Sequence, residues 1–396
     1  MPFYNDLRKN LNKQKSYSLI FPEWYVANEF DGTVDEKDKE RIQEDKTRTI
    51  NNLLSLRKGL EEIPSKKADK NLLIASWNIR AFGQSENRLP EAFYYIAEII
   101  SRFDITAIQE VTGSLRGLEI VMKILGSDYK YMLNDVTGGT KGNSERSVYI
   151  YNDKRVKLSG LSGEITFWDN LVKNSNVKFL YRTPYITGFK AGWKKFSIIN
   201  LHLRPGDKKA DFAHRLEAMQ LLVKVIKDRI ASKKFWNENI ILLGDMNLYS
   251  PTSRSTKDGP LIDFLDKKKF CQIDALTKEG TNLKQDEIYD RMFFLKDDYF
   301  QIAKDANDEE KGGVFNPYDH ILKKKDDVDK ITTYKNIIKA KTHLTDYNVR
   351  TKTGRQNYYI DEFRKMQLSD HLPIWAEIDI DSSDIFLKDQ LSDDTT

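Results

Sequence analysis

The stretch that most constrains how this chain can fold is a run of four apolar residues that ends in Gly-Asp-x-Asn. The run, Ile240–Leu243, is short and has polar flanks, so it predicts a buried strand, not a helix. Gly244 lets the chain turn at the strand's end because glycine has no Cβ to clash. Asp245 and Asn247 are two residues apart, so on an extended segment their side chains point to the same side and can contact one small ligand. A turn that Asp and Asn merely cap is the alternative, and only the rest of the chain can decide between them.

Composition places the chain among globular proteins. Its 396 residues suffice for a large core, and 31% charged residues describe a heavily charged surface. The net charge of +4 supports a polyanionic partner only weakly, so any such surface must come from local clustering. The single cysteine, Cys271, excludes an internal disulfide and suits a reducing compartment. No run approaches the roughly twenty apolar residues of a membrane span, and the first residues lack a signal-peptide pattern. We therefore expect a cytoplasmic protein.

Residues 1–70 differ in pattern from the rest of the chain. They carry 14 basic and 13 acidic side chains, and their charged first half precedes Ile50, Leu53, Leu54 and Leu60 at near-helical spacing. This pattern predicts a helical N-terminal extension with a linker. We expect the helix to dock on the main domain; self-association or binding of a partner protein is the alternative.

From residue 71 to 380, short apolar runs alternate with amphipathic segments. This alternation predicts a mixed α/β sheet architecture, in one version with two sheets. An enlarged basic insertion occupies about 304–365, and the acidic residues 381–396 are expected to form a frayed tail. The expected strands are 72–77, 105–109, 130–133, 147–151, 187–189, 195–201, 240–243, 290–295 and 373–380, and the expected helices are 90–102, 115–125, 211–230 and 261–268.

Polar residues of the kinds that bind metals and phosphates recur at the ends of these strands. One such residue is commonly only a cap, but six sites of this kind are hard to ascribe to chance. They are Asn78 with Arg80, Gln109 with Glu110, Glu145 with Arg146, His202, Asp245 with Asn247, and Asp370 with His371.

These residue types suit the attack of water on a phosphodiester. A hard divalent cation prefers oxygen ligands, and Glu110 with Asp370, Asn78 or Asp245 nearby would hold Mg²⁺ or Mn²⁺. A histidine oriented by a carboxylate can take a proton from water, and a second can protonate the leaving oxygen. No cysteine or histidine set has zinc spacing, and no Gly-x-x-x-x-Gly-Lys loop occurs.

Seven short motifs, in order, give the chain a family resemblance. They are Trp77-Asn78-Ile79-Arg80-Ala81-Phe82-Gly83, Ile108-Gln109-Glu110-Val111, Asn143-Ser144-Glu145-Arg146, Leu201-His202, Gly244-Asp245-Met246-Asn247, Tyr289-Asp290-Arg291-Met292 and Ser369-Asp370-His371. Over residues 71–380 the chain resembles the endonuclease/exonuclease/phosphatase superfamily, and within it the deoxyribonuclease I branch. The resemblance implies a four-layered α/β sandwich with two central mixed sheets and a metal-dependent site across their edge.

The resemblance also implies roles for individual residues. Glu110 would be the principal ligand of Mg²⁺, with Mn²⁺ or Ca²⁺ as alternatives, and Asn78 and Asp370 would lie beside the metal. The motifs also imply the remaining roles. His202, oriented by Glu145, would be the general base or its equivalent, and His371, paired with Asp290, would be the second catalytic histidine. Asp245 and Asn247 would orient water and phosphate, and Arg80 and Arg182 would contact the DNA backbone. Which histidine is acid and which base stays open.

Two departures from the family pattern affect this interpretation. Thr112 stands where the resembling nuclease has a minor-groove arginine, which puts the mode of groove reading in doubt. Asp319, in a second Tyr-Asp motif, competes with Asp290, although Met-Phe-Phe after Asp290-Arg291 fits the family strand better.

Basic residues outside the motifs are candidates for substrate contact. Residues 311–365 hold 13 basic and 7 acidic side chains interleaved with tyrosines, which suits either a nucleic-acid surface or an ordinary solvated one. Arg204 and Lys208, shortly after His202, are better placed for strand contact.

The favoured function is a Mg²⁺-dependent nuclease that cleaves DNA with little sequence preference. The alternatives are a phospholipid or inositol-phosphate phosphodiesterase of the same superfamily, and a catalytically silent DNA- or protein-binding module. Retention of every expected ionisable group argues against the silent module.

Overall fold

The computed structural model of the protein describes residues 36–83, 88–136, 144–178, 180–234, 239–249, 258–343 and 346–393. Residues 1–35, the first half of the N-terminal extension, and the glycine-rich turn at 137–143 lie outside these residues.

Two mixed sheets form the centre of the fold. The six-stranded sheet has the order β10-β11-β1-β2-β4-β3, and the five-stranded sheet has the order β5-β6-β7-β8-β9. In the first sheet the strands are β1 (Asn71–Phe82), β2 (Ile105–Val111), β3 (Tyr129–Leu133), β4 (Arg146–Asn152), β10 (Gly312–Val314) and β11 (Ile374–Asp379). In the second they are β5 (Lys157–Glu164), β6 (Tyr185–Ala191), β7 (Lys194–His202), β8 (Ile240–Asp245) and β9 (Asp290–Leu295). The pairs β1–β2 and β7–β8 are parallel, so two strands of each sheet end at the same edge.

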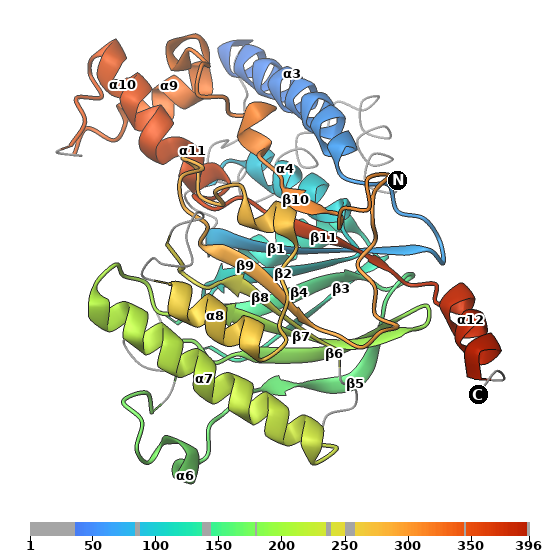
Figure 1. Ribbon diagram of the computed structural model, residues 1–396. Helices are drawn as coiled ribbons and strands as arrows, with labels where there is room; N and C mark the ends of the chain where they lie inside the picture. Colours follow the sequence, from blue (N-terminus) through green and yellow to red (C-terminus); the bar gives the residue numbers. More distant parts are fainter. Residues whose placement is uncertain are drawn as a thin grey trace.

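Helices cover both outer faces of the sheet pair. Figure 1 shows α7 and α8 on one side, and α3, α4, α9 and α10 on the other. The helices are α3 (Glu36–Gly59), α4 (Pro90–Ser101), α5 (Arg116–Leu125), α6 (Asp169–Val172), α7 (Lys209–Ala231), α8 (Gly259–Lys267), α9 (Thr332–Lys339), α10 (Lys352–Tyr358), α11 (Arg364–Gln367) and α12 (Ser383–Asp393). Short 3₁₀ turns lie at Leu60–Glu62, Asp274–Thr277, Pro317–Asp319 and Val328–Lys330, and a π-helical turn at Tyr359–Phe363.

Three apolar clusters hold these layers together. The first cluster consists of strand side chains that are buried between the two sheets, including Ile74, Phe189, Ile198, Leu243 and Phe294. A second cluster joins the six-stranded sheet to the helices on its outer face, and a third joins the five-stranded sheet to α7 and α8. Because side chains alternate along a strand, each central strand supplies two clusters at once. The result is the predicted four-layered α/β sandwich.

The α3 helix packs on the main body, with a different apolar face from the one expected. Leu53 and Leu60 are buried, but Ile50 and Leu54 are 39% and 59% exposed. Leu56, buried completely, completes the contact face. Polar contacts also fix the helix: Arg48 Nη2 lies 2.5 Å from Glu91 Oε2 on α4.

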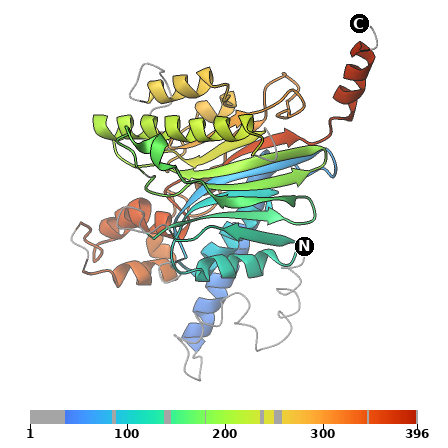
Figure 2. The ribbon, with the colours of Figure 1, turned by 90° about the horizontal axis from the view of Figure 1, so that it is seen from below.

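The C-terminal residues differ from the expected frayed tail. Residues 383–393 form α12, which projects from the sandwich in Figure 2. Two contacts tie α12 to the body. The Tyr299 hydroxyl lies 2.6 Å from Asp389 Oδ2 on α12, and the Trp193 ring contacts the Phe386 ring on α12. These contacts depend on residues far apart in the chain, so the acidic composition alone did not predict them.

The region predicted as a basic insertion is folded. It contains β10 and α9 and α10, and its side chains enter the cluster on the outer face of the six-stranded sheet. Tyr334, Tyr359 and Phe363 are buried there. Its tyrosines therefore serve the core in large part, which weakens the interpretation of this segment as a stacking surface for nucleic acid.

Candidate active site

Strand register brings three of the predicted residues side by side. His202 pairs with Asp245 across β7 and β8, and Asp245 pairs with Asp290 across β8 and β9. All three lie at the strand ends. Gly244 permits this close packing: its φ is +134°, and a Cβ there would lie 2.0 Å from the Leu201 carbonyl oxygen.

Asp245 is the centre of the cluster. Its Oδ2 lies 3.4 Å from His202 Nε2 and 3.7 Å from His371 Nε2. The same oxygen accepts a hydrogen bond of 3.0 Å from Asn78 Nδ2. Asp245 is almost fully buried, so these groups face it in place of bulk water.

His202 is backed by a carboxylate and an arginine. Glu145 Oε2 lies 3.2 Å from His202 Nδ1, and Arg182 donates to both Glu145 oxygens at 2.9 and 3.2 Å. Burial on its own would raise the pKa of Glu145, but the hydrogen bonds and charges of His202 and Arg182 outweigh it and lower the pKa to about 2. Glu145 is therefore ionised, and it orients the ring with Nε2 toward Asp245.

His371 has its own carboxylate partner. Its Nδ1 lies 2.8 Å from Asp290 Oδ2, and Asp290 is fully buried. Burial favours the neutral ring, but the charges of Asp290 and Asp245 dominate and hold the pKa of His371 well above its usual range. The competing candidate Asp319 is exposed in a 3₁₀ turn, so the geometry selects Asp290 as the partner of His371.

Oxygen ligands for a hard cation gather next to Asp245. Glu110 accepts one hydrogen bond from Asn78 Nδ2 at 3.0 Å and one from the Ala81 N–H at 3.1 Å. Asn78 Oδ1 is buried and, among the residues that the structure describes, has no hydrogen-bond partner. A buried amide oxygen without a partner costs free energy, and a bound cation would remove that cost. The residues therefore fit a divalent metal ion.

Asp370 lies further out than the resemblance implies. Its side chain is 41% exposed, and Arg80 Nη1 lies 4.0 Å from its Oδ2. Within the described residues, no hydrogen bond joins its carboxylate to Glu110 or Asn78. A further group of possible metal ligands consists of Asp245, Asp290 and His371, whose ligand atoms lie within 4.8 Å of one another.

Asn247 occupies a fixed position beside the cluster. Its backbone adopts φ +49°, its N–H donates to Asp245 Oδ1 at 2.9 Å, and its Nδ2 donates to the Leu203 carbonyl at 3.1 Å. Within the described part of the chain no hydrogen bond reaches its side-chain oxygen, which can therefore accept from a ligand or water. Asparagine tolerates the left-handed region better than most residues, which explains its use here.

The four residues predicted to contact substrate have different environments. Arg182 is buried against Glu145, so its guanidinium supports the His202 dyad. Arg80 is part exposed and lies 3.6 Å from Glu362 Oε2. Arg204 pairs with Asp211 at 2.8 Å and lies over the Tyr181 ring, while Lys208 is exposed at the start of α7. Arg80, Arg204 and Lys208 are the ones a substrate can reach.

Sequence reasoning named Ser369 and Gln109 within motifs but did not identify them as residues that hold these groups in place. Ser369 Oγ donates to the Asn78 carbonyl at 2.6 Å and accepts from the His371 N–H at 3.1 Å. Between the sheets, Gln109 Nε2 donates to Asn200 Oδ1 at 2.7 Å. Both were visible as polar residues within or beside apolar strands, but their partners lie too far away in sequence to be named in advance.

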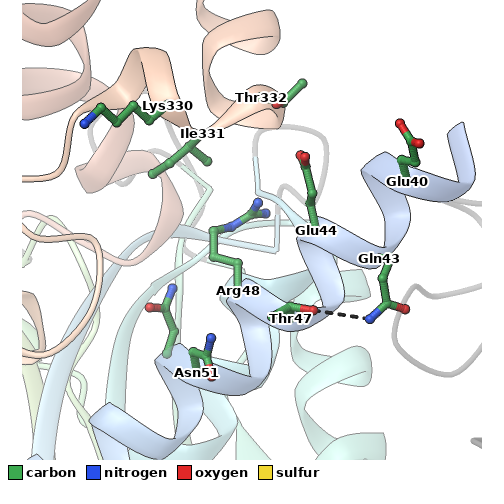
Figure 3. Close-up of a pocket in the computed structure, with 10 residues that line it drawn as sticks. Glu40, Gln43, Glu44, Thr47, Arg48, Asn51, Lys330, Ile331 and Thr332 are labelled. Carbon is green, nitrogen blue, oxygen red and sulfur yellow. Dashed lines mark hydrogen bonds between the residues drawn. The ribbon is translucent and has the colours of Figure 1, made fainter. Parts of the chain in front are cut away.

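A groove of about 870 Å³ lies away from these residues, between α3 and the segment that leads into α9 (Figure 3). Glu40, Glu44 and Lys330 are among its lining residues. Arg48, which also lines it, is already paired with Asp45 and Glu91. The groove therefore presents mixed charges, and its described lining residues include no buried cation free to bind an anion.

No family model matches the chain. Among curated proteins it is 27% identical to deoxyribonuclease-1 of Homo sapiens over 185 residues, which is 45% of this chain and 61% of that protein. It is 26% identical to deoxyribonuclease-1 of Equus caballus over 271 residues, or 63% of this chain and 90% of that protein. The chain thus matches less than two thirds of the human protein's length. No helix among the described residues is long and apolar enough to cross a membrane.

Solved structures give more distant similarities. An endonuclease/exonuclease/phosphatase family protein from Bacteroides thetaiotaomicron is 18% identical with a TM-score of 0.47, over 78% of this chain and 98% of that one. The human Nocturnin catalytic domain with bound sulfate is 15% identical with a TM-score of 0.46, over 79% of this chain and 95% of that one.

Proposed function

Because the chain belongs to the endonuclease/exonuclease/phosphatase superfamily, we propose that it is a divalent-metal-dependent phosphodiesterase that cleaves DNA internally with little sequence preference. One observation carries the proposal: two histidines, each with a carboxylate at Nδ1, direct Nε2 toward the same oxygen of Asp245. Phosphodiester hydrolysis needs one proton removed from water and one delivered to the leaving oxygen, and two such rings can do both.

His371 is suited to deliver the proton. Its raised pKa keeps the ring charged near neutral pH, so Nε2–H can donate to a phosphate or leaving oxygen. Asp290 at Nδ1 balances the charge and fixes the ring orientation.

His202 and Asp245 are suited to hold the attacking water. Glu145 fixes His202 through Nδ1, which leaves Nε2 directed at the Asp245 carboxylate. A water molecule bound between these two groups would be held in a fixed orientation, and one of the two groups would accept its proton. The Asn247 side chain, locked beside Asp245, adds a polar group for the phosphate.

Glu110 and Asn78 would hold Mg²⁺, with Mn²⁺ or Ca²⁺ as alternatives, and Asp370 would contribute from the rim. A divalent ion there would polarise the phosphoryl oxygen and offset the charge that develops on it. The carboxylates of Glu110 and Asp245, both within 3.0 Å of the Asn78 amide, supply the negative charge that such an ion requires.

DNA is the proposed substrate because the curated relatives are deoxyribonucleases and because Lys208 is exposed and Arg80 and Arg204 are partly exposed. Arg80, Arg204 and Lys208 can neutralise backbone phosphates without reading bases, which suits low sequence preference.

Plasmid nicking tests the proposal. Purified protein is incubated with supercoiled plasmid, single-stranded DNA, RNA and phosphatidylinositol phosphate vesicles, with Mg²⁺, Mn²⁺ or EDTA. We expect Mg²⁺-dependent nicking that His202→Ala and Glu110→Ala abolish. The exposed histidine variant His343→Ala serves as the matched control and should keep full activity.

Release of phosphate or headgroup from the vesicles without DNA cleavage would replace this proposal with the lipid or inositol-phosphate alternative. DNA binding without turnover of any substrate would identify a silent binding module.

A further inference from the structure

The loop that carries Asp370 and His371 lies against the folded insertion. Its backbone polar groups are satisfied from several directions. Arg88 donates to the Leu368 carbonyl at 3.2 Å, Leu283 N–H donates to the Asp370 carbonyl at 2.9 Å, and Trp77 Nε1 donates to the His371 carbonyl at 3.0 Å. The partner of Ser369 is the insertion residue Tyr318.

Tyr318 satisfies both backbone groups of Ser369 with one hydroxyl. The Ser369 N–H donates to the Tyr318 oxygen at 3.2 Å, and the Tyr318 hydroxyl contacts the Ser369 carbonyl oxygen as donor. Both residues are buried, so water has little access to replace either bond. The tyrosine thus fixes a residue whose side chain contacts both the Asn78 carbonyl and the His371 N–H.

Ser369 passes this constraint to the reacting groups. Its Oγ donates to the Asn78 carbonyl and accepts the N–H groups of His371 and Arg80, at 2.6, 3.1 and 3.2 Å. A shift of Ser369 therefore moves both the Asn78 amide and the His371 ring.

Tyr318 is itself held firmly. It lies in the turn Pro317–Asp319, where Asn316 Oδ1 accepts the Tyr318 N–H at 3.1 Å and Pro317 presets the first backbone angle. The Arg364 guanidinium covers its ring at 4.6 Å, and Arg364 Nε donates to the Leu322 carbonyl at 2.6 Å. Asn316, Arg364 and Leu322, which form this support, all belong to the insertion.

We propose that Tyr318 is a positioning residue for His371 and Asn78, acting through Ser369, and that the insertion supports the site through this one side chain. The kinetic part of this inference rests on the proposed phosphodiesterase function. Misplacement of a reacting group by about 1 Å can lower a rate about 100-fold, so loss of one buried hydroxyl is expected to affect turnover strongly.

Tyr318→Phe tests the proposal in the full chain, because it removes only the hydroxyl. The matched control is Tyr334→Phe, since Tyr334 is also a buried insertion tyrosine, but its hydroxyl donates to Glu91 on α4. Kinetics on a labelled DNA duplex with Mg²⁺ should show kcat at least tenfold lower for Tyr318→Phe with KM within threefold of wild type. Tyr334→Phe should retain kcat within twofold.

A spectroscopic measurement separates this inference from the proposed activity. The proton in the His371 Nδ1–Asp290 hydrogen bond should give a downfield NMR resonance, assigned by its loss in His371→Gln. We expect Tyr318→Phe to broaden or shift it and Tyr334→Phe to leave it in place. An inactive wild type would refute the proposed function while this resonance still tests the positioning role. The inference is overturned if Tyr318→Phe keeps wild-type kcat and resonance, or if both variants lose them in proportion to thermal stability.

Discussion

The Oδ2 atom of Asp245 lies 3.4 Å from Nε2 of His202, at the matched ends of two parallel strands. His371 approaches the same oxygen to 3.7 Å from the other sheet. One carboxylate oxygen therefore lies between two rings that different sheets carry. The roles of the neighbouring side chains therefore depend on the charge of this carboxylate.

Replacing Asp245 by Asn should lower turnover far more than substrate affinity. The variant keeps the shape of the side chain but removes the charge between the histidines. We expect kcat to fall by about 10²–10⁴-fold, the usual range for loss of a proton-transfer group, with KM within a few-fold. Steady-state kinetics on plasmid DNA measures both. A loss of DNA binding at unchanged kcat would assign Asp245 to recognition.

Glu145 should contribute stability that disappears in acid. Its pKa in the folded protein is about 2, below its ordinary 4.5, so the contribution is complete above pH 4.5 and is lost as the pH falls from 4.5 to 2. The shift corresponds to about 3 kcal/mol. The unfolding free energy of Glu145→Gln should therefore lie below wild type at pH 7, with the gap closing toward pH 2. Exposed Glu119→Gln is the control, and an equal gap at all pH values would contradict this assignment.

Divalent metal should stabilise the protein through Glu110. A ligand that binds only the folded state adds about 2.7 kcal/mol at 100 times its Kd. Mg²⁺ or Mn²⁺ should raise the Tm of wild type, and EDTA should reverse the increase. Glu110→Gln should lose most of the response, whereas Asp319→Asn, at an exposed carboxylate, should keep it. An unchanged response in Glu110→Gln would move the metal to Asp245, Asp290 and His371.

Lys208 should act on DNA affinity alone. Its side chain is exposed, so Lys208→Ala should leave Tm unchanged while it weakens binding and lowers the slope of log K against log salt by about one. Anisotropy of labelled duplex across a salt series, in an Asp245→Asn background that prevents cleavage, measures this slope.

Arg182→Met should instead lower Tm, because it removes the partner of buried Glu145. A smaller slope for Arg182→Met than for Lys208→Ala would reverse the two roles.

The sequence sufficed for nine of the eleven strands of the two sheets and for the edge that carries the chemistry, but β5 (Lys157–Glu164) and β10 (Gly312–Val314) were not predicted. The strand 290–295 was predicted with its observed bounds, because an apolar run between polar flanks has few alternatives. Asp245 and His202 were assigned to one site by the family resemblance. Their atomic contact depends on register, which periodicity alone does not supply.

Contacts between distant segments account for what was missed. Arg182 was expected at the DNA backbone, but Glu145, which directly precedes β4 and lies 37 residues earlier in the chain, pairs with it. Tyr318 sits 51 residues before Ser369, and nothing local to either indicates the bond. The apolar face of α3 was misjudged for the same reason, because α4 and α9 determine which side is covered.

Arg48 should contribute a large share of the stability that the protein gains from the contact between α3 and the sandwich. This guanidinium lies 2.5 Å from both Asp45 Oδ1 and Glu91 Oε2, and all three groups are mostly buried. Arg48→Met leaves two buried carboxylates without their cation, which typically costs about 3–5 kcal/mol. Urea unfolding measures the loss.

The exposed residue Glu40 on the same helix provides the control, and Glu40→Ala should change the unfolding free energy by less than about 0.5 kcal/mol. The double variant Arg48→Met with Glu91→Gln should recover part of the loss, because it removes one of the uncompensated charges. Equal losses in Arg48→Met and Glu40→Ala would show that α3 is not held through this contact, and would return the helix to the role of a partner-binding extension.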